Sequence, residues 1–331
     1  MKAIQMLAAG GPEVLQLAEV AEPAIDGAGQ VKVRVHAAGV NPIDTKLRSR
    51  GLFFPDALPA ILGLDGAGVI CEVGAGVNAF KPGDEVWYCN GGLGREPGSY
   101  AEYVVLEASL ARRKPKSIDF AEAAAGPLVL LTAWEGLFDR AALQAGQTVL
   151  VHAGAGGVGH VAIQLAKWAG ARVVTTVGTA EKAAFVRALG ADHVIDYRRE
   201  DFVEAIAKWT DGRGVDVCFD TVGGETFTRS IDATAHYGSL ITLLEPAAGT
   251  VWREARTRNL KIGFELMLTP LMRDLPEARA HQGEILDRCA ELIDQGCLRL
   301  HVSHRYVLAE AAAAHTQIEG GRVQGKLVLL P

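Results

Sequence analysis

The residues best suited to chemistry form a glycine-rich run, Gly154-Ala155-Gly156-Gly157-Val158-Gly159. It follows an apolar segment expected to be a strand (148–152), and it opens a segment with helical apolar spacing (158–168). In that context the run is typical of a dinucleotide-binding turn. Gly154 permits the tight turn, Gly156 lets the backbone approach a diphosphate, and Gly159 lets the helix pack closely. The helix N-terminus would attract the phosphates. The alternative is a turn with a structural role only.

The end of the next expected strand, residues 172–177, indicates which dinucleotide binds. NAD enzymes usually place an acidic residue there, about 20 residues past the glycine turn, to hold the ribose 2′-hydroxyl. Here Gly178 and Thr179 follow the strand, and Lys182 lies three residues further on. The missing acid and the added cation favour NADPH, with its 2′-phosphate near Lys182. The alternative for Lys182 is a solvated helix residue.

The elements that must position these residues alternate between strand and helix from about residue 117. Strands are expected at 148–152, 172–177, 193–195, 215–219 and 239–244, with helices at 121–138, 158–168, 181–189, 202–209 and 226–235. Such alternation predicts a parallel sheet with right-handed crossovers, which is the doubly wound α/β fold. Residues 245–273 follow no clear pattern, and we expect them to form a pocket wall or a dimer surface.

The N-terminal part, up to about residue 115, has β-like signals. Val31, Val33 and Val35 alternate with polar residues, as in a half-buried strand. After Gly296 the chain shows a strand, a helix (309–318) and a last strand (326–330), too little for a separate domain. We therefore expect this tail to return to the first domain.

Length, charge and cysteine content bound the class of protein. A chain of 331 residues suits two domains. The net charge of −6 without a basic cluster argues against nucleic acid as a partner. Five cysteines without a Cys-x-x-Cys pair favour a reducing compartment. The N-terminus lacks the apolar core of a signal peptide, and no apolar run reaches the roughly 20 residues of a membrane span. We expect a cytoplasmic protein with no membrane partner.

Several separated motifs occur in one order along the chain. They are Gly39-Val40-Asn41-Pro42-Ile43-Asp44, Leu62-Gly63-Leu64-Asp65-Gly66-Ala67-Gly68, Gly98-Ser99-Tyr100-Ala101-Glu102-Tyr103, the glycine turn and Gly325-Lys326-Leu327-Val328. With them the chain resembles the medium-chain dehydrogenase/reductase superfamily, in its quinone oxidoreductase branch, nearly end to end. The resemblance implies an α/β protein with a GroES-like β-rich catalytic domain (1–120 and 298–331) and a Rossmann dinucleotide-binding domain (121–297). It also implies a homodimer formed through the cofactor domain.

The resemblance further suggests catalytic residues. Asn41 would face the nicotinamide and the substrate and donate to a forming oxyanion, and it can cap a helix as well. Asp44 would orient Asn41 or the ribose. Many relatives have Tyr where this chain has Lys46, which is either a source of a proton or positive charge, or a solvated helix residue.

Three more residues correspond to family positions around the cofactor. Thr132 would lie beside the nicotinamide, and Tyr197 would lie on the adenosine side. Arg322 would reach the cofactor phosphates, or it is a surface charge in a turn.

Zinc alcohol dehydrogenases of the superfamily carry Cys, His and Cys where this chain has Asn41, Leu64 and residues 127–129. Tetrahedral catalytic zinc needs three such ligands. We therefore expect no metal, and hydride delivery to an electrophilic acceptor, a quinone or an α,β-unsaturated carbonyl (enone). The alternatives are a zinc-type alcohol dehydrogenase and a non-catalytic NADPH-binding protein.

Overall fold

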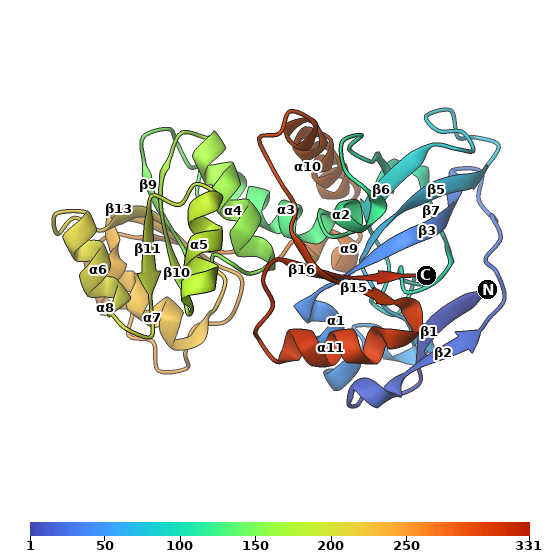
Figure 1. Cartoon of the computed structure of the whole chain (residues 1–331), viewed down its shortest axis with the longest axis horizontal. Coiled ribbons are helices and arrows are strands. Elements are labelled where there is room, and N and C mark those ends of the chain that lie inside the picture. Colours follow the sequence, from blue (N-terminus) through green and yellow to red (C-terminus); the bar gives the residue numbers. More distant parts are fainter. The chain divides into compact units, whose positions relative to one another are not determined.

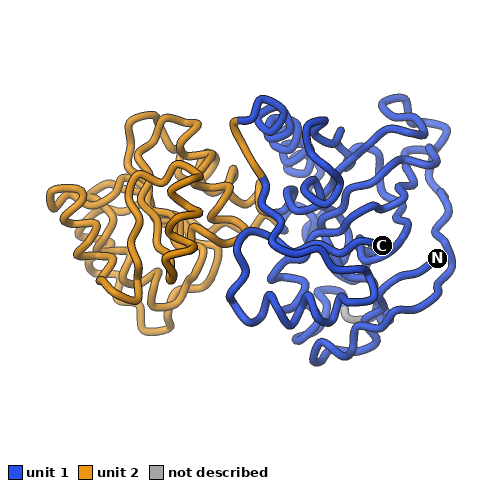
Figure 2. Tube along the Cα trace, in the orientation of Figure 1, with its two compact units in different colours: residues 1–128, 268–296, 300–331 blue, residues 129–267, 297–299 orange. Residues whose placement is uncertain are grey.

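The structure is a computed structural model that describes residues 1–54 and 56–331 (Figure 1). The chain forms two compact units (Figure 2). Unit 1 consists of Met1–Leu128, Leu268–Gly296 and Leu300–Pro331, and unit 2 of Val129–Met267 and Cys297–Arg299. Residues 268–296 thus pack with unit 1, although the sequence analysis places them in the cofactor domain. Because compactness does not by itself define a domain, the boundaries at 121 and 297 stay a prediction.

Unit 2 is built on a sheet in which each neighbouring pair of strands is parallel. Its order is β11 (His193–Asp196), β10 (Arg172–Val177), β9 (Thr148–Val151), β12 (Val215–Asp220), β13 (Thr234–Thr242) and β14 (Lys261–Phe264). From β9 the chain adds β10 and β11 outward on one side, and then β12, β13 and β14 outward on the other. The order therefore reverses between β9 and β12, which is where ligands bind in sheets of this kind. β14 lies within the stretch that the sequence pattern left undefined.

Helices cover both faces of this sheet. They are α4 (Gly157–Trp168), α5 (Ala180–Ala188), α6 (Phe202–Trp209), α7 (Gly224–Ala233) and α8 (Arg253–Thr257). Phe202 of α6 and Phe227 of α7 pack with Val174 of β10 in one apolar core. Successive side chains of a strand point to opposite faces. Thr175, next to Val174, accordingly lies near Ile163 of α4 on the other face.

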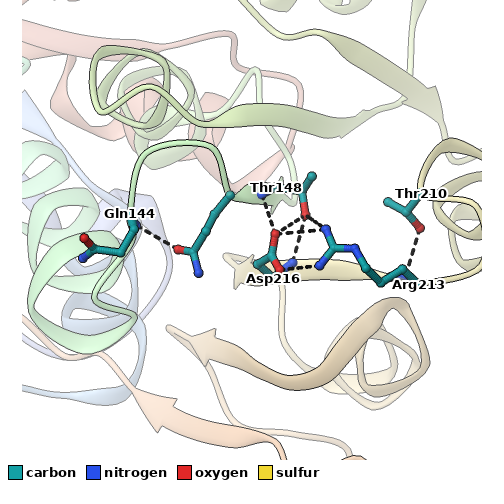
Figure 3. A network of polar contacts seen from close by, with 7 residues as sticks. Gln144, Thr148, Thr210, Arg213 and Asp216 are labelled. Atoms are coloured by element: carbon teal, nitrogen blue, oxygen red, sulfur yellow. Dashed lines mark hydrogen bonds and ion pairs between the residues drawn. The ribbon is translucent and has the colours of Figure 1, made fainter.

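A charged network joins the beginnings of β9 and β12 (Figure 3). The Asp216 carboxylate accepts hydrogen bonds from the backbone N–H and the hydroxyl of Thr148, both at 2.8 Å, and from Arg213. Burial by itself would raise the pKa of Asp216, but these donors outweigh burial and lower the pKa to about 2. The carboxylate therefore holds the two central strands β9 and β12 in register at their amino ends, opposite the end of the sheet that carries the glycine turn.

Unit 1 contains a small sheet and a larger one. The small sheet has the order β2 (Leu15–Glu19), β1 (Lys2–Met6) and β4 (Ala60–Ile61). The larger sheet has the order β15 (Val302–Val307), β16 (Lys326–Leu330), β3 (Gln30–Val40), β5 (Asp65–Val73), β6 (Glu85–Cys89) and β8 (Arg112–Arg113), with β7 (Tyr103–Glu107) also on β3. β16 pairs antiparallel with β3, so the C-terminal tail completes the sheet of the N-terminal part. Val31, Val33 and Val35 are buried in its core, as their alternation predicts.

The helices of unit 1 are α1 (Pro42–Arg50), α2 (Phe120–Ala124), α9 (Thr269–Arg273), α10 (Pro276–Asp294) and α11 (Ala311–Glu319).

The expectation of one helix over 121–138 is wrong. The segment consists of α2, then α3 (Pro127–Trp134), then a π-helical stretch, η4 (Glu135–Arg140). Pro127 explains the break, because its nitrogen cannot donate a hydrogen bond and its ring disfavours a helical residue before it. In the described part of the chain, no helix is long and apolar enough to cross a bilayer.

Candidate cofactor and active site

The glycine turn lies between β9 and α4, at the carboxyl end of the parallel sheet. Gly156 is the N-cap of α4 in an extended conformation, and no side chain of the described residues caps the helix there. Gly157 and Val158 are its first residues. N–H groups at a helix N-terminus that no side chain satisfies are donors for a phosphate, and the helix dipole favours negative charge. This end of α4 is therefore suited to an anionic group.

Two of the glycines are required by close contacts. A Cβ atom at Gly154 would overlap Oγ1 of Thr175, and one at Gly159 would overlap the carbonyl oxygen of Ala153. At Gly156 the nearest atom to such a Cβ would be the Ala153 oxygen at 3.2 Å. The turn thus forms a cradle that is closed on the protein side at Gly154 and Gly159 and more open at Gly156. This geometry fits a dinucleotide diphosphate.

The end of β10 brings Gly178 together with Tyr197. A Cβ atom at Gly178 would lie 2.8 Å from the Tyr197 hydroxyl and 3.2 Å from Nε of Arg198. Thr179 caps α5, and its hydroxyl accepts from the backbone N–H of Lys182 at 3.2 Å. Arg198 is a cation at this edge that the sequence analysis missed. It follows Asp196-Tyr197, and Asp196 pairs with Val177, so strand pairing was the signal that could have found it.

In unit 1, Asn41 and Asp44 lie together at the start of α1. The Asn41 backbone N–H donates to Oδ2 of Asp44 at 2.8 Å, as part of a capping box. The Asn41 side chain donates through Nδ2 to Oδ2 of Asp65 at 2.9 Å, and its Oδ1 accepts from the Lys326 side chain. Nζ of Lys326 also donates to the Val40 carbonyl at 3.0 Å and lies 3.6 Å from Asp65 Oδ2. The Asn41 amide is thus held between a basic and an acidic group, all of them buried.

Asp65 and Lys326 lie in two of the family motifs, but local sequence patterns do not show that these distant motifs meet at Asn41. Burial raises the pKa of Asp65 and lowers the pKa of Lys326, while the attraction between the two groups opposes both shifts. Asp65 also accepts from the Leu128 backbone N–H at 2.8 Å, at the start of α3. The cluster therefore joins four segments that are distant in sequence.

Asp44 has a second neighbour besides Asn41. Its Oδ2 accepts from the Tyr100 hydroxyl at 3.2 Å, and that hydroxyl lies 3.2 Å from Nε2 of His315. Oδ1 of Asp44 has no hydrogen-bond partner among the residues that the structure describes. Burial raises the pKa of Asp44 to about 7, against the opposing effects of its hydrogen bonds and of Lys326. Asp44 can therefore hold or release a proton near neutral pH.

The remaining predicted residues occupy separate places. Lys46 is half-buried on α1, and its burial, with Arg50 nearby, lowers its pKa. Thr132 is buried on α3. Arg322 is exposed between α11 and β16. Their predicted contacts with the cofactor stay predictions.

The residues at the zinc positions do not fit a zinc site. Leu64 is a buried alkyl chain, and the Asn41 amide already contacts Lys326 and Asp65. A divalent cation at Asn41 would stand beside the Lys326 amine. Among the described residues, no group of three or more His, Cys, Asp or Glu side chains is arranged to hold a metal. Catalysis without zinc stays a prediction.

Two family models match the chain. Residues 27–116 match the alcohol dehydrogenase GroES-like domain, and residues 189–329 match the zinc-binding dehydrogenase family. The word zinc in the description of the second model refers to the family as a whole. In this chain the positions of the zinc ligands are Asn41, Leu64 and residues 127–129, which offer neither a thiolate nor an imidazole.

Relatives match over the full length. The chain is 38% identical over 330 residues to a quinone oxidoreductase of Pseudomonas aeruginosa, covering 100% of this chain and 99% of the relative. It superposes with a TM-score of 0.89 and 34% identity on the quinone oxidoreductase of Escherichia coli in complex with NADPH, covering both chains fully. A structure of an NAD-dependent alcohol dehydrogenase gives a TM-score of 0.90 at 34% identity, again over both full chains.

A parallel sheet in this order, with an open glycine turn after its first strand, defines a dinucleotide-binding protein. The chain belongs to the medium-chain dehydrogenase/reductase superfamily, in its quinone oxidoreductase-like branch. The predicted family is confirmed, and so is the predicted combination of a GroES-like part with a Rossmann sheet.

Proposed function

We propose that this protein is an NADPH-dependent oxidoreductase that delivers hydride to a quinone, with α,β-unsaturated carbonyl compounds as a second acceptor class. The observation that carries the proposal is the open glycine cradle at the uncapped N-terminus of α4. The full-length similarity to quinone oxidoreductases, including one in complex with NADPH, supports both the reaction and the cofactor.

In this proposal the cofactor lies along the carboxyl end of the unit 2 sheet. Its diphosphate rests on residues 154–159 of the glycine turn. The 2′-phosphate lies near Gly178, Thr179 and Tyr197, where Lys182 and Arg198 supply positive charge. β10 itself ends without an acid, and Asp196 at the end of the adjacent β11 accepts from the Arg198 backbone N–H. Thr132, which is buried on α3, would lie beside the nicotinamide. The contact of Arg322 with the phosphates stays a prediction from the sequence.

Bound NADPH supplies the hydride, and the acceptor oxygen must then gain a proton. Asp44 is placed to hold a proton, since its pKa of about 7 lies near the operating pH. The amide of Asn41 is fixed in one orientation by Lys326 and Asp65, which leaves one N–H of Nδ2 for a developing oxyanion. Lys46, with its lowered pKa, is the second candidate proton donor.

A screen of NADPH oxidation tests the proposal. The purified protein is mixed with NADPH and, separately, with benzoquinones, alkenals and simple ketones, and absorbance of the reduced nicotinamide is followed. We expect turnover with quinones, weaker turnover with alkenals and none with ketones. Turnover of ketones or alcohols that depends on added zinc would favour the alcohol dehydrogenase alternative. Tight NADPH binding without consumption by any acceptor would favour the non-catalytic alternative.

We also propose a homodimer that forms along β14. This strand is the end of the sheet order, and an edge strand offers unpaired backbone groups to a second copy. Phe264 and Leu266, at its end, are 59% and 48% exposed. Exposed apolar groups beside an open edge support a symmetric contact between copies.

The proposed location is the cytoplasm, supported by five cysteines that are all free thiols.

A further inference from the structure

A chain of hydrogen bonds runs behind the glycine turn and ends on Ala153, the residue immediately before the turn. Nε2 of His152, just after β9, lies 2.9 Å from Oγ of Ser230 on α7. Nδ1 of the same ring lies 3.1 Å from Oγ1 of Thr176 on β10. The Thr176 oxygen in turn lies 3.1 Å from the backbone nitrogen of Ala153. Two strands, a helix and the turn are thus linked through one imidazole.

The groups at the two ends of this hydrogen-bond chain determine the position of each proton. Oγ of Ser230 lies 2.6 Å from the Thr226 carbonyl, which can only accept, so the Ser230 hydroxyl donates there. Ser230 then accepts from Nε2–H of His152. The backbone N–H of Ala153 can only donate, so Thr176 accepts from it and donates its own proton to Nδ1 of His152. This assignment makes His152 a neutral imidazole with its proton on Nε2.

The surroundings of the ring agree with a neutral state. His152 is 1% exposed, Thr176 3% and Ser230 0%. Burial lowers the pKa of His152 to about 4, although Asp220 nearby acts in the opposite direction. The imidazole therefore keeps one donor and one acceptor at neutral pH, as the chain requires.

The residue that this chain holds determines the shape of the turn. Ala153 has a φ of 50°, in the left-handed region that residues other than glycine rarely adopt. Its carbonyl oxygen accepts from the Gly156 N–H at 2.9 Å and packs directly against Gly159. A shift of the Ala153 backbone would therefore also move Gly156, which faces the proposed diphosphate, and Gly159, which packs behind it.

We propose that His152 is a positioning residue for the dinucleotide: acting through Thr176, it holds Ala153 in the conformation that presents the N-terminus of α4 to the diphosphate. This role rests on the proposed binding of NADPH at the turn. His152 contacts neither the reacting atoms nor the acceptor in this role, so it should govern cofactor affinity and leave the chemical step alone.

Substitution at the ring tests the role. His152→Leu removes the donor and the acceptor. We expect NADPH to bind about five- to fiftyfold more weakly, because loss of the buried hydrogen bond disfavours the binding-competent conformation of Ala153 and the apparent affinity falls with its population. KM for NADPH should rise by a similar factor, while kcat and KM for the quinone change less than about twofold because the role lies outside the chemical step. His152→Gln carries one donor and one acceptor in its amide and should recover most of the affinity. Thr176→Val, which cuts the chain next to Ala153, should weaken NADPH at least as much as His152→Leu.

One further measurement tests the proton positions on which this role depends. The ¹⁵N NMR spectrum of the His152 ring should show a protonated Nε2 and a bare Nδ1 that do not change between pH 8 and pH 6. A protonated Nδ1, or a charged ring at neutral pH, would overturn the proposed chain. NADPH affinity equal to wild type in both His152→Leu and Thr176→Val would overturn the positioning role alone. Failure of the wild-type protein to bind NADPH would instead overturn the proposed function, and this role with it.

Discussion

The substitution Gly156→Ala separates cofactor binding from folding more sharply than any other change in the glycine turn. Gly156 has φ −78° and ψ −179°, a conformation open to any residue. A methyl group there meets the Ala153 oxygen at 3.2 Å, a tight contact that a small shift relieves. The proposed diphosphate, however, approaches the backbone at this residue, where an added methyl group stands in its way.

The expected magnitudes follow from these contacts. Alanine restricts the unfolded chain, which stabilises by about 0.4–1 kcal/mol, and alanine is a poorer N-cap than glycine, which costs about 0.5–1 kcal/mol. The free energy of unfolding should therefore change by less than about 1 kcal/mol. NADPH should bind at least about tenfold more weakly, equivalent to about 1.4 kcal/mol.

Gly159→Ala is the matched control. Its Cβ would overlap the Ala153 oxygen and come within 2.7 Å of Cα of Gly154, backbone atoms that cannot rotate away. We expect it to lose about 1–3 kcal/mol of stability as well as NADPH affinity. Urea unfolding followed by tryptophan fluorescence measures the stability of both variants, and quenching of the same fluorescence by NADPH measures affinity. A Gly156→Ala protein that binds NADPH with the wild-type Kd would refute the placement of the diphosphate on this turn.

Three further predictions concern other parts of the molecule. Lys182→Glu should weaken NADPH about tenfold through charge reversal beside the 2′-phosphate and leave NADH nearly unchanged. Lys208→Glu, an equal charge reversal at an exposed residue in the last turn of α6, is the control. Better binding of NADH than NADPH by the wild-type protein would contradict the cofactor assignment. Asp216 has its pKa lowered from 3.8 to about 2 in the folded protein, so its stabilisation is present above pH 4 and is lost as the pH falls toward 2. The loss should be about 1–2 kcal/mol after solvent screening, and acid unfolding of Asp216→Asn should lack this step. Phe264→Lys should convert the proposed dimer to a monomer in light scattering, whereas Val251→Lys, which replaces a side chain 69% exposed, should not; a monomeric wild-type protein would rule out the β14 contact.

Local patterns in the sequence were sufficient for the main architecture. The alternation of apolar strands and amphipathic helices from residue 148 onward predicts the parallel sheet, because periodicity follows directly from which face of each element is buried. The glycine turn could be recognised for a similar reason, since its meaning depends only on the strand before it and the helix after it. Pro127 marks the break between α2 and α3, but the apolar composition on both sides of it favours one continuous helix, so composition alone predicts the wrong element there.

Only the tertiary structure decided which buried polar groups meet. Asn41 and Lys326 are separated by 285 residues, and His152 and Ser230 by 78. Strand β14 was hidden because it is short and half-exposed, so it lacks the apolar run of a central strand. A hydrophobic side chain is satisfied by any apolar neighbour, and its pattern can therefore be read one element at a time. A buried donor or acceptor needs one particular partner at hydrogen-bond distance, and that partner is set by how the whole chain folds back on itself.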